Sequence, residues 1–363
     1  MKIIYKYITV ELITPLLFGA AAFTAIFVGT DLLFDMIDYY NDGVRLFTLL
    51  QLFFLNLPAI VVITLPMATL LGTIMAFGRL SGDSEITALR AGGISIYKLV
   101  LPALIMGLLM TFITIGVNEY VVPRASYLSE QIVWEFETGQ RMPTTQSNLL
   151  LPSKDSLGKP DFFLFAGHFE GDTGEMEDII FQDFEAGQPV LLIEAEEAVW
   201  KEDGGWLFRY GRIMHLRTGA RIPGGTFVEY NVSLPYEPGQ IAKLNKDIDE
   251  MSFMELKKHI EFLDRQGKTI SEELVNLHQR LSIPFANLIF ALLAAVLGIQ
   301  PQRSGGTATG MGISIGVIFI YFTLMTVGSA MGEQGTIPPA LGAWLQNIIF
   351  FVVGSVMLFR LGK

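Results

Sequence analysis

Cysteine is absent from the 363-residue sequence, which excludes disulfide bonds and thiolate metal sites. Histidine is scarce as well. The four histidines, His168, His215, His259 and His278, do not pair at the spacing of metal ligands, so no metal site is expected.

A nucleotide-binding motif is missing too. The sequence contains no G-x-x-x-x-G-K-[ST], and its glycine cluster at Gly305–Gly310 lacks both the lysine and a preceding strand. Paired carboxylates such as Glu196-Glu197 and Glu272-Glu273 are interpreted as solvated faces. The chain is therefore not expected to be an enzyme, and no cofactor is predicted.

Charged residues are missing from six long stretches of a chain that is 51% hydrophobic and has a mean hydropathy of +0.46. A helix of about 20 residues crosses the roughly 30 Å hydrocarbon core of a bilayer, and each stretch is long enough for one. The first stretch is too long for the core of a signal peptide, so a retained helix is expected. The six predicted spans are approximately residues 12–30, 48–77, 99–117, 281–300, 310–331 and 337–359.

Basic residues are nearly absent from one side of these spans. If the N-terminus is cytoplasmic, only Arg45 of the nine basic residues outside 124–280 falls on the opposite side. The other eight are Lys2, Lys6, Arg79, Arg90, Lys98, Arg303, Arg360 and Lys363. Positive charge favours the cytoplasmic side, so both termini are predicted to be cytoplasmic and the protein to be a multi-pass membrane protein.

The central insertion is acidic. Residues 124–280 carry 27 acidic and 16 basic side chains, which accounts for the whole net charge of −11. Nucleic-acid binding requires a basic face, so nucleic acid is excluded as a partner. On the predicted topology the insertion lies outside the cytoplasm.

Hydrophobic residues in the insertion change to a period of two between about residues 145 and 238. Turns between the runs are predicted at Gly171-Asp172, Asp203-Gly204-Gly205 and Pro223-Gly224-Gly225. Roughly eight short antiparallel strands in a β-sandwich or jelly roll are expected. The predicted fold class is a polytopic α-helical membrane protein with six spans, three on each side of an inserted periplasmic all-β jelly-roll domain. The expected domains are residues 1–123 with the first three spans, 124–250 with the β-domain, and 251–363 with an amphipathic helix and the last three spans.

A short polar stretch, Gly78–Leu99, separates the second and third predicted spans. Its helix signals are an N-cap, an acidic first turn, a basic last turn and a glycine stop, supplied by Asp83 or Ser84, Glu85, Arg90 and Gly92-Gly93. A helix over about residues 82–92 is therefore predicted in the cytoplasm. It is either a solvated connector or a docking helix that a partner protein displaces.

Inside the spans Asn56 is the polar residue that stands out, and ionisable groups are almost missing, which argues against ion-coupled transport. Energy for transport would then come from outside the chain, with the cytoplasmic helix as the entry point. Asp31 and Asp35 stand one helical turn apart at the outer end of the first span. They are candidates for lining a cavity or binding a cation, and an interfacial cap is the alternative.

Four segments, taken in order along nearly the whole chain, resemble the LptF/LptG permease family, the membrane subunits of the lipopolysaccharide exporter. They are Arg79-Leu80-Ser81 through Gly92-Gly93, Asn118-Glu119 with Val122-Pro123, Trp200 with Gly205-Trp206-Leu207-Phe208 and Gly211, and Glu255-Leu256 with Arg280-Leu281 and Pro284-Phe285.

The resemblance implies a non-catalytic permease subunit of an ATP-driven ABC transporter. Such a transporter extracts lipopolysaccharide from the inner membrane and passes it to a periplasmic β-jelly-roll bridge. The implied partners are a cytoplasmic LptB-like ATPase dimer, a second LptF/LptG-type permease in a hetero- or homodimer, an LptC/LptA-like jelly-roll protein and lipopolysaccharide. The positions that match the family's ATPase-coupling helix are Arg79, Ser84, Glu85, Ala88, Arg90 and Gly92, with Glu85 at its key acidic contact.

The sequence departs from the family at the outer end of the first span. Family members often carry lysines there, whereas Thr30–Asp42 has none and is acidic. Arg124 is the basic residue expected to contact a headgroup, and Asp31 and Asp35 are expected to bind substrate through a divalent cation. Two alternatives remain at this point: an ABC-type exporter of another glycolipid, and a non-transporting membrane adaptor with a periplasmic protein-binding domain.

Overall fold

The computed structural model divides the chain into two compact units, Met1–Val133 with Ser271–Lys363 and Trp134–Ile270. We call them the helical unit and the β unit. The structure describes residues 2–138, 145–154, 159–171, 173–185, 187–201, 205–217, 220–234, 236–238, 241, 248–265, 268–299 and 306–362.

Six helices or helical runs in the described residues are long and apolar enough to cross a membrane, which confirms the six predicted spans. The helices of this unit are α1 (Lys2–Phe27), α2 (Leu33–Asn41), α3 (Leu46–Gly82), α4 (Glu85–Ala91), α5 (Ile96–Gly116), α6 (Val122–Thr138), α9 (Ser271–Ile299), α10 (Gly306–Glu333) and α11 (Pro339–Gly362).

Two of the spans continue beyond their expected ends. A π-helical turn, η1 (Val28–Leu32), joins α1 to α2, and a second one, η2 (Val117–Val121), joins α5 to α6. The first span was expected to end near Asp31 and Asp35, but the helix runs on to Asn41. Both carboxylates lie exposed on the helix surface, and the helical run continues past them.

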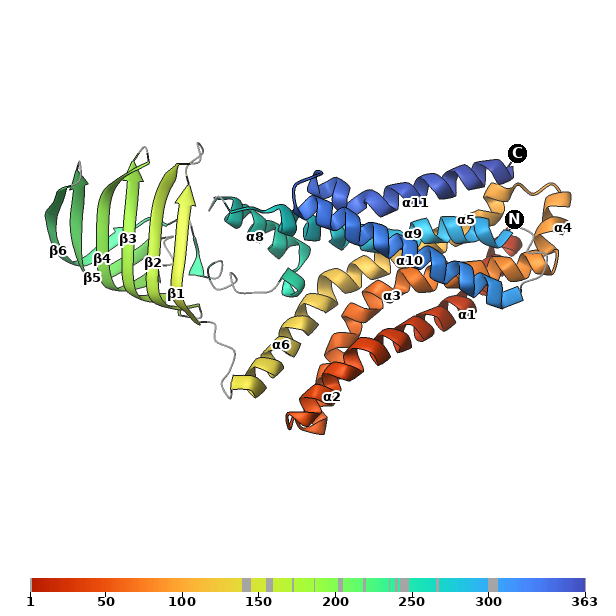
Figure 1. The fold of residues 1–363 in the computed structure, drawn as a ribbon, viewed down its shortest axis with the longest axis horizontal. Coiled ribbons are helices and arrows are strands. Elements are labelled where there is room, and N and C mark those ends of the chain that lie inside the picture. Colours follow the sequence, from red (N-terminus) through yellow and green to blue (C-terminus); the bar gives the residue numbers. More distant parts are fainter. Residues whose placement is uncertain are drawn as a thin grey trace. The chain divides into compact units, whose positions relative to one another are not determined.

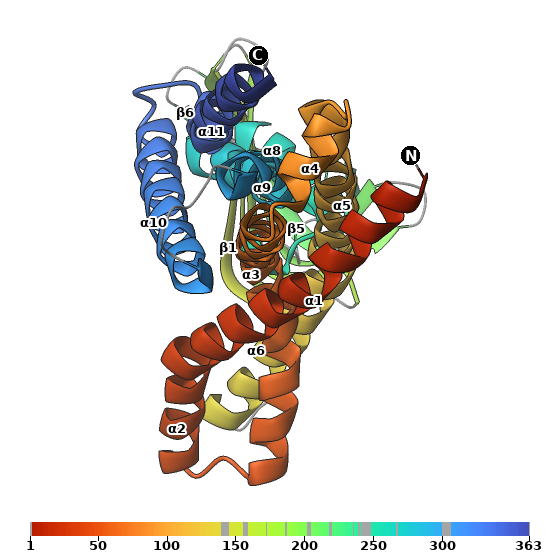
Figure 2. The ribbon, with the colours of Figure 1, turned by 90° about the vertical axis from the view of Figure 1, so that its right-hand side faces the viewer.

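The helices of this unit pack around two central ones, α3 and α9. Helix α1 packs on α3, and α5 packs on α9. Helix α10 packs on α3, α11 packs on α9, and α10 and α11 also contact each other (Figures 1 and 2). Close packing of α1 on α3 depends on Gly72. A Cβ atom at this position would lie 2.7 Å from the backbone N and Cα of Leu16, so only glycine fits.

Buried polar side chains join the helices. Asn287 of α9 is fully buried; its Oδ1 accepts a hydrogen bond from the Thr69 hydroxyl of α3 (2.8 Å), and its Nδ2 donates to Thr114 Oγ1 of α5 (3.1 Å). Asn347 of α11 accepts a hydrogen bond from the Tyr321 hydroxyl of α10 (2.8 Å) and donates to the Ser282 carbonyl of α9 (2.7 Å). These bonds satisfy groups that would be costly to leave unpaired in an apolar environment.

The β unit contains six described strands in one antiparallel sheet, in the consecutive order β1-β2-β3-β4-β5-β6. They are β1 (Thr145–Lys154), β2 (Pro160–Glu170), β3 (Glu175–Glu185), β4 (Gln188–Lys201), β5 (Gly205–Arg217) and β6 (Ala220–Val232). An inserted β-domain is thus confirmed. The expected count of roughly eight short strands is wrong for the described residues, which form six strands of 10 to 14 residues.

A predicted turn at Pro223-Gly224-Gly225 is also wrong, because these residues lie inside β6. Gly225 has φ +116°, and the register of the β5–β6 pair shifts between Ile213 and Met214. Glycine permits this backbone conformation at low cost, so here it marks an irregularity within a strand.

One face of the sheet is buried under the chain that follows it. The core includes Trp206, whose indole N–H donates to the Tyr236 carbonyl (2.9 Å), and side chains of α8 (Phe253–Arg265) such as Phe262. A reciprocal pair of hydrogen bonds between Ser252 and Glu255 starts α8, with the Ser252 N–H donating to Glu255 Oε2 (3.0 Å). The predicted amphipathic helix over 251–266 is therefore present, except that Gln266 lies outside the described residues.

Candidate functional site

The site begins with α4, which follows α3 after a two-residue turn and ends at Gly92. Gly93 has φ +85°, in agreement with the predicted glycine stop. Ser84 occupies the N-cap position, but the predicted side-chain cap is wrong. Ser84 has φ +60° and makes no side-chain cap hydrogen bond, because an N-cap bond requires an extended backbone at that residue.

Helix α4 has a buried and an exposed side. Ile86 is 4% exposed and belongs to a core cluster with Ile8 and Leu12 of α1 and Phe77 of α3. On the other side Thr87, Ala88, Arg90 and Gly92 are exposed, whereas Glu85 is half-buried. The helix therefore rests on α1 and α3 and presents its outer face.

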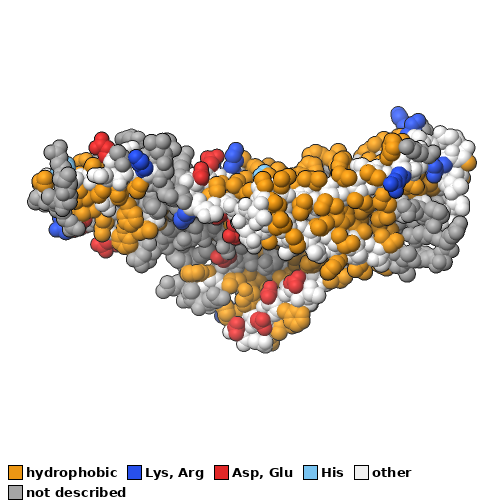
Figure 3. All heavy atoms as spheres, turned by 45° about the horizontal axis from the view of Figure 1, so that its top comes forward, with side chains coloured by type: hydrophobic (Ala, Val, Ile, Leu, Met, Phe, Trp, Pro, Cys, Tyr) orange, Lys and Arg blue, Asp and Glu red, His pale blue; other side chains and the backbone are white. Residues whose placement is uncertain are grey.

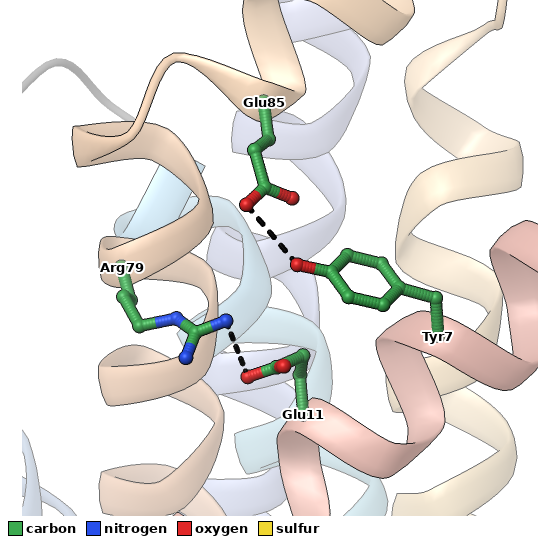
Figure 4. A network of polar contacts seen from close by, with 4 residues as sticks. All are labelled: Tyr7, Glu11, Arg79 and Glu85. Atoms are coloured by element: carbon green, nitrogen blue, oxygen red, sulfur yellow. Dashed lines mark hydrogen bonds and ion pairs between the residues drawn. The ribbon is translucent and has the colours of Figure 1, made fainter.

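Polar contacts tie α4 and the end of α3 to α1. The Tyr7 hydroxyl donates a hydrogen bond to Glu85 Oε1 (3.1 Å), and the Arg79 guanidinium forms an ion pair with Glu11 (2.6 Å), as Figure 4 shows. Tyr7 and Glu11 lie one turn apart, on one face of α1. Sequence reasoning missed both; the available signal was two polar side chains four residues apart before the uncharged run.

Two further contacts tie this region to the last spans. The Arg90 guanidinium donates to the Leu361 carbonyl at the end of α11 (3.3 Å), and the Ser81 hydroxyl donates to the Ile299 carbonyl at the end of α9 (3.1 Å). All six predicted coupling residues thus lie at one end of the helical unit. Arg79 and Arg90 contact other helices of this chain, and Glu85 and Ala88 lie on α4 itself.

Basic side chains gather at this same end of the helical unit (Figure 3). Lys2, Lys6, Lys98 and Arg360 are exposed there, whereas Arg303 and Lys363 lie outside the described residues. The opposite end of this unit, formed by α2 and the start of α3, carries exposed acidic side chains (Figure 3).

The predicted substrate-binding residues belong to that acidic end. Asp31 of η1, Asp35 of α2 and Arg124 of α6 are all exposed, and none forms an ion pair with another residue in the described part of the chain. Apolar contacts between α2, α3 and α6, including Met36, Leu49 and Ile132, hold this end together. No group of three or more His, Asp or Glu that could hold a metal ion occurs within the described residues.

The structure also locates two further sequence features, the Asn118 segment and a G-x-S-x-G pattern. Asn118 of η2 donates a hydrogen bond to the Arg280 carbonyl of α9 (3.4 Å), so two of the family-like segments meet. A G-x-S-x-G pattern at Gly312–Gly316 lies inside α10, where Ser314 is buried and donates to the Gly310 carbonyl (2.9 Å). It therefore does not form the exposed strand-to-helix turn of a hydrolase nucleophile.

The β unit contains a hollow of about 490 Å³ lined by core aromatic residues and by carboxylates. Phe162 and Phe181 lie beside Asp161 and Asp183. Burial raises the pKa of Asp183, a hydrogen bond from the Phe184 backbone opposes this shift, and the nearby carboxylates of Asp161 and Glu185 raise the pKa further. The ionised form of Asp183 is thus disfavoured in the folded unit.

We expect Asp183→Asn to stabilise the β unit at neutral pH. A raised folded-state pKa means that folding is penalised above that pKa, and that the penalty disappears as pH falls below about 3.9, the unfolded value. Thermal unfolding of the full chain in detergent should show a higher transition temperature for the variant at pH 7 and a smaller difference at pH 4. A variant less stable at pH 7 would contradict this, and Asp178→Asn, an exposed position on the same strand, is the control.

The fold and the site together define a class: a multi-pass membrane permease with three spans on each side of an inserted β unit, and with a short helix displayed at one end. The model of the family described as "Lipopolysaccharide export system permease LptF/LptG" matches residues 6–360. The chain therefore belongs to the LptF/LptG family of inner-membrane, multi-pass permeases, and the resemblance seen in the sequence is confirmed.

Curated relatives carry both names. The chain is 22% identical over 322 residues to the lipopolysaccharide export system permease protein LptG of Escherichia coli K12, covering 88% of this chain and 86% of the relative. It is 22% identical over 306 residues to LptG of Haemophilus influenzae, covering 82% of each. It is also 22% identical over 329 residues to LptF of Escherichia coli K12, covering 85% of this chain and 81% of the relative. Equal identity to LptF and LptG does not assign the chain to either subunit.

Proposed function

We propose that this chain is the permease subunit of an ATP-driven exporter that extracts lipopolysaccharide from the inner membrane and passes it to a periplasmic β-bridge. The observation that carries the proposal is the position of α4. It is exposed on its outer face, packed on α1 and α3 through Ile86, and tied by polar contacts to α1 and α11. A partner that moves α4 would move spans at both sides of the bundle.

The end with α4 is assigned to the cytoplasm. Its exposed basic side chains and the acidic opposite end of the helical unit support this orientation, since positive charge favours the cytoplasmic side. The β unit, inserted between α6 and α9, is then periplasmic.

The proposed partners are those that the resemblance to the family implies, placed according to this orientation. An LptB-like ATPase dimer binds α4 from the cytoplasm, with Ser84, Glu85, Ala88 and Gly92 in contact and Arg79 and Arg90 in supporting roles. A second LptF/LptG-type permease pairs with this one in the membrane. An LptC/LptA-like jelly-roll protein receives the lipid from the β unit.

The acidic end of the first span is proposed to contact lipid headgroups. Asp31 and Asp35 are exposed and one turn apart, so a divalent cation could bridge them to phosphates, while Arg124 would contact a phosphate directly. We expect Asp31→Lys combined with Asp35→Lys to abolish export, because it replaces both proposed cation ligands with positive charges. Export would be measured as ATP-dependent release from proteoliposomes, with Glu333→Lys, an exposed acidic position at the end of α10, as the control. Unchanged export in the double variant would contradict this role.

The function is tested by purifying the detergent-solubilised chain with the host's LptB-like ATPase and a second permease, and by reconstituting the complex. ATP-dependent release of lipopolysaccharide to an acceptor jelly-roll protein is the expected result. Release of another glycolipid in its place would keep the chain an exporter subunit and change only the lipid that it transports. Failure of the chain to retain any ATPase would contradict the exporter and favour a membrane adaptor.

A further inference from the structure

Four side chains converge where α1 passes the turn between α3 and α4 (Figure 4). They carry two negative charges and one positive charge, since Glu11 and Glu85 face a single guanidinium, that of Arg79. The guanidinium is bonded to Glu11 at 2.6 Å, and Glu85 accepts a hydrogen bond from the neutral Tyr7 phenol at 3.1 Å. Within the described residues the negative charge of Glu85 is not neutralised by an ion pair.

Arg79 also faces Tyr7, the residue that contacts Glu85 (Figure 4). The Tyr7 phenol contacts Glu85 and interacts electrostatically with Arg79, so the two charged groups border the same hydroxyl. A guanidinium pairs readily with carboxylates through its fork of N–H donors. If Glu11 were neutral, Glu85 would be the remaining carboxylate of the cluster available to Arg79.

A phenol acts differently from a cation on a carboxylate. The Tyr7 O–H donates one hydrogen bond and fixes the orientation of Glu85, but it leaves the full negative charge in place. Glu85 Oε2 and the second lone pair of Oε1 stay available for a donor from outside.

We propose that Glu11 and Tyr7 are positioning residues that keep Glu85 charged and oriented for a basic side chain of the ATPase. Glu11 holds Arg79 away from Glu85, and Tyr7 aims the carboxylate. This inference rests on the proposed docking of the ATPase to α4 and adds two residues of the first span, Tyr7 and Glu11, that sustain the contact.

A purely structural role of the ion pair is the competing explanation. The Arg79 side chain is 53% exposed and that of Glu11 is 22% exposed, and ion pairs this exposed contribute little to folding stability. Loss of the pair alone should therefore leave the protein folded, which makes binding measurements on its variants interpretable.

The test compares the affinity of the full-length chain in detergent for the LptB-like ATPase across a double-mutant cycle. We expect Glu11→Gln to weaken binding by about tenfold, because the freed Arg79 neutralises Glu85. Arg79→Gln should weaken binding less than Glu11→Gln does, and Glu11→Gln combined with Arg79→Gln should return it to within about twofold of Arg79→Gln alone. Tyr7→Phe, which keeps the ring and removes the donor, should weaken binding by about threefold.

A structural role predicts a different pattern, because Glu11→Gln and Arg79→Gln break the same ion pair. Equal loss in both single variants without recovery in the double variant would overturn the proposal, as would wild-type affinity of Glu11→Gln. Binding that weakens less with salt in Glu11→Gln than in the wild type would support it, since the neutralised carboxylate contributes less Coulomb attraction. Failure of the wild type itself to bind the ATPase would contradict the proposed function, a result distinguishable from a failure limited to the variants.

Discussion

Replacement of Glu85 by alanine is expected to abolish retention of the LptB-like ATPase by the detergent-solubilised permease. Glu85 lies in the first turn of α4, half-buried beside Tyr7, and its charge is not cancelled by an ion pair within the described residues. Removal of a charged anchor from an interface costs about 2 kcal/mol or more, which corresponds to roughly thirtyfold or more in Kd.

Thr87→Ala is the matched control for this prediction. Thr87 lies two residues further along α4 and is exposed, so its substitution leaves both the helix and the Glu85 carboxylate in place. Co-purification of the ATPase with wild type and Thr87→Ala, but not with Glu85→Ala, would identify α4 as the coupling helix. Retention of the ATPase by Glu85→Ala at wild-type level would remove the docking role from α4, whatever the effect on transport.

The coupling region also shows what the sequence could and could not predict. The short helix, its position between two spans and its glycine stop follow from local composition, and all are present. The contacts of Glu85 with Tyr7 and of Arg90 with the Leu361 carbonyl do not follow from it, because they join residues 78 and 271 positions apart. Hydropathy locates a span but carries no information about its neighbours in the bundle.

The same limit applies to the interior of the helical unit. Asn56 was the polar residue that stood out in the spans, and it does contact another helix, donating a hydrogen bond to Ser129 Oγ of α6 (3.1 Å). Asn287 was overlooked, although it is fully buried and joins α3, α5 and α9. A single asparagine in an apolar run looks alike whether it faces a partner helix or solvent, and only the packing distinguishes the two.

In the β unit, the period of two located the β-domain but overestimated its strands, since roughly eight short strands were expected and six longer ones are described. The glycine pair in Pro223-Gly224-Gly225 was interpreted as a turn because glycine is the usual turn residue. In the structure it lies inside β6, which pairs with β5. Pairing with a neighbour overrides local turn preference there.

The second substitution with a large expected effect disturbs the packing of α1 on α3. We expect Gly72→Ala to destabilise the helical unit by about 1–3 kcal/mol, because the added Cβ would lie 2.7 Å from the Leu16 backbone and the two helices would have to separate. Gly78→Ala on the same helix is the control. Nothing lies within 4 Å of a Cβ at Gly78, so there alanine should be neutral or stabilising by about 0.5–1 kcal/mol through its better helix propensity.

The measurement is the temperature at which each variant loses its folded fraction in detergent, and a double variant shows which atoms limit the contact. The atoms nearest the added Cβ belong to the backbone of Pro15 and Leu16, not to side chains. Leu16→Ala should therefore fail to rescue Gly72→Ala, whereas recovery would mean that the Leu16 side chain sets the spacing.

Because α1 also carries Tyr7 and Glu11, separation of these helices should displace both residues from Glu85 and Arg79. Gly72→Ala is thus expected to weaken ATPase binding as well, while Gly78→Ala, closer to α4 in sequence, leaves it unchanged.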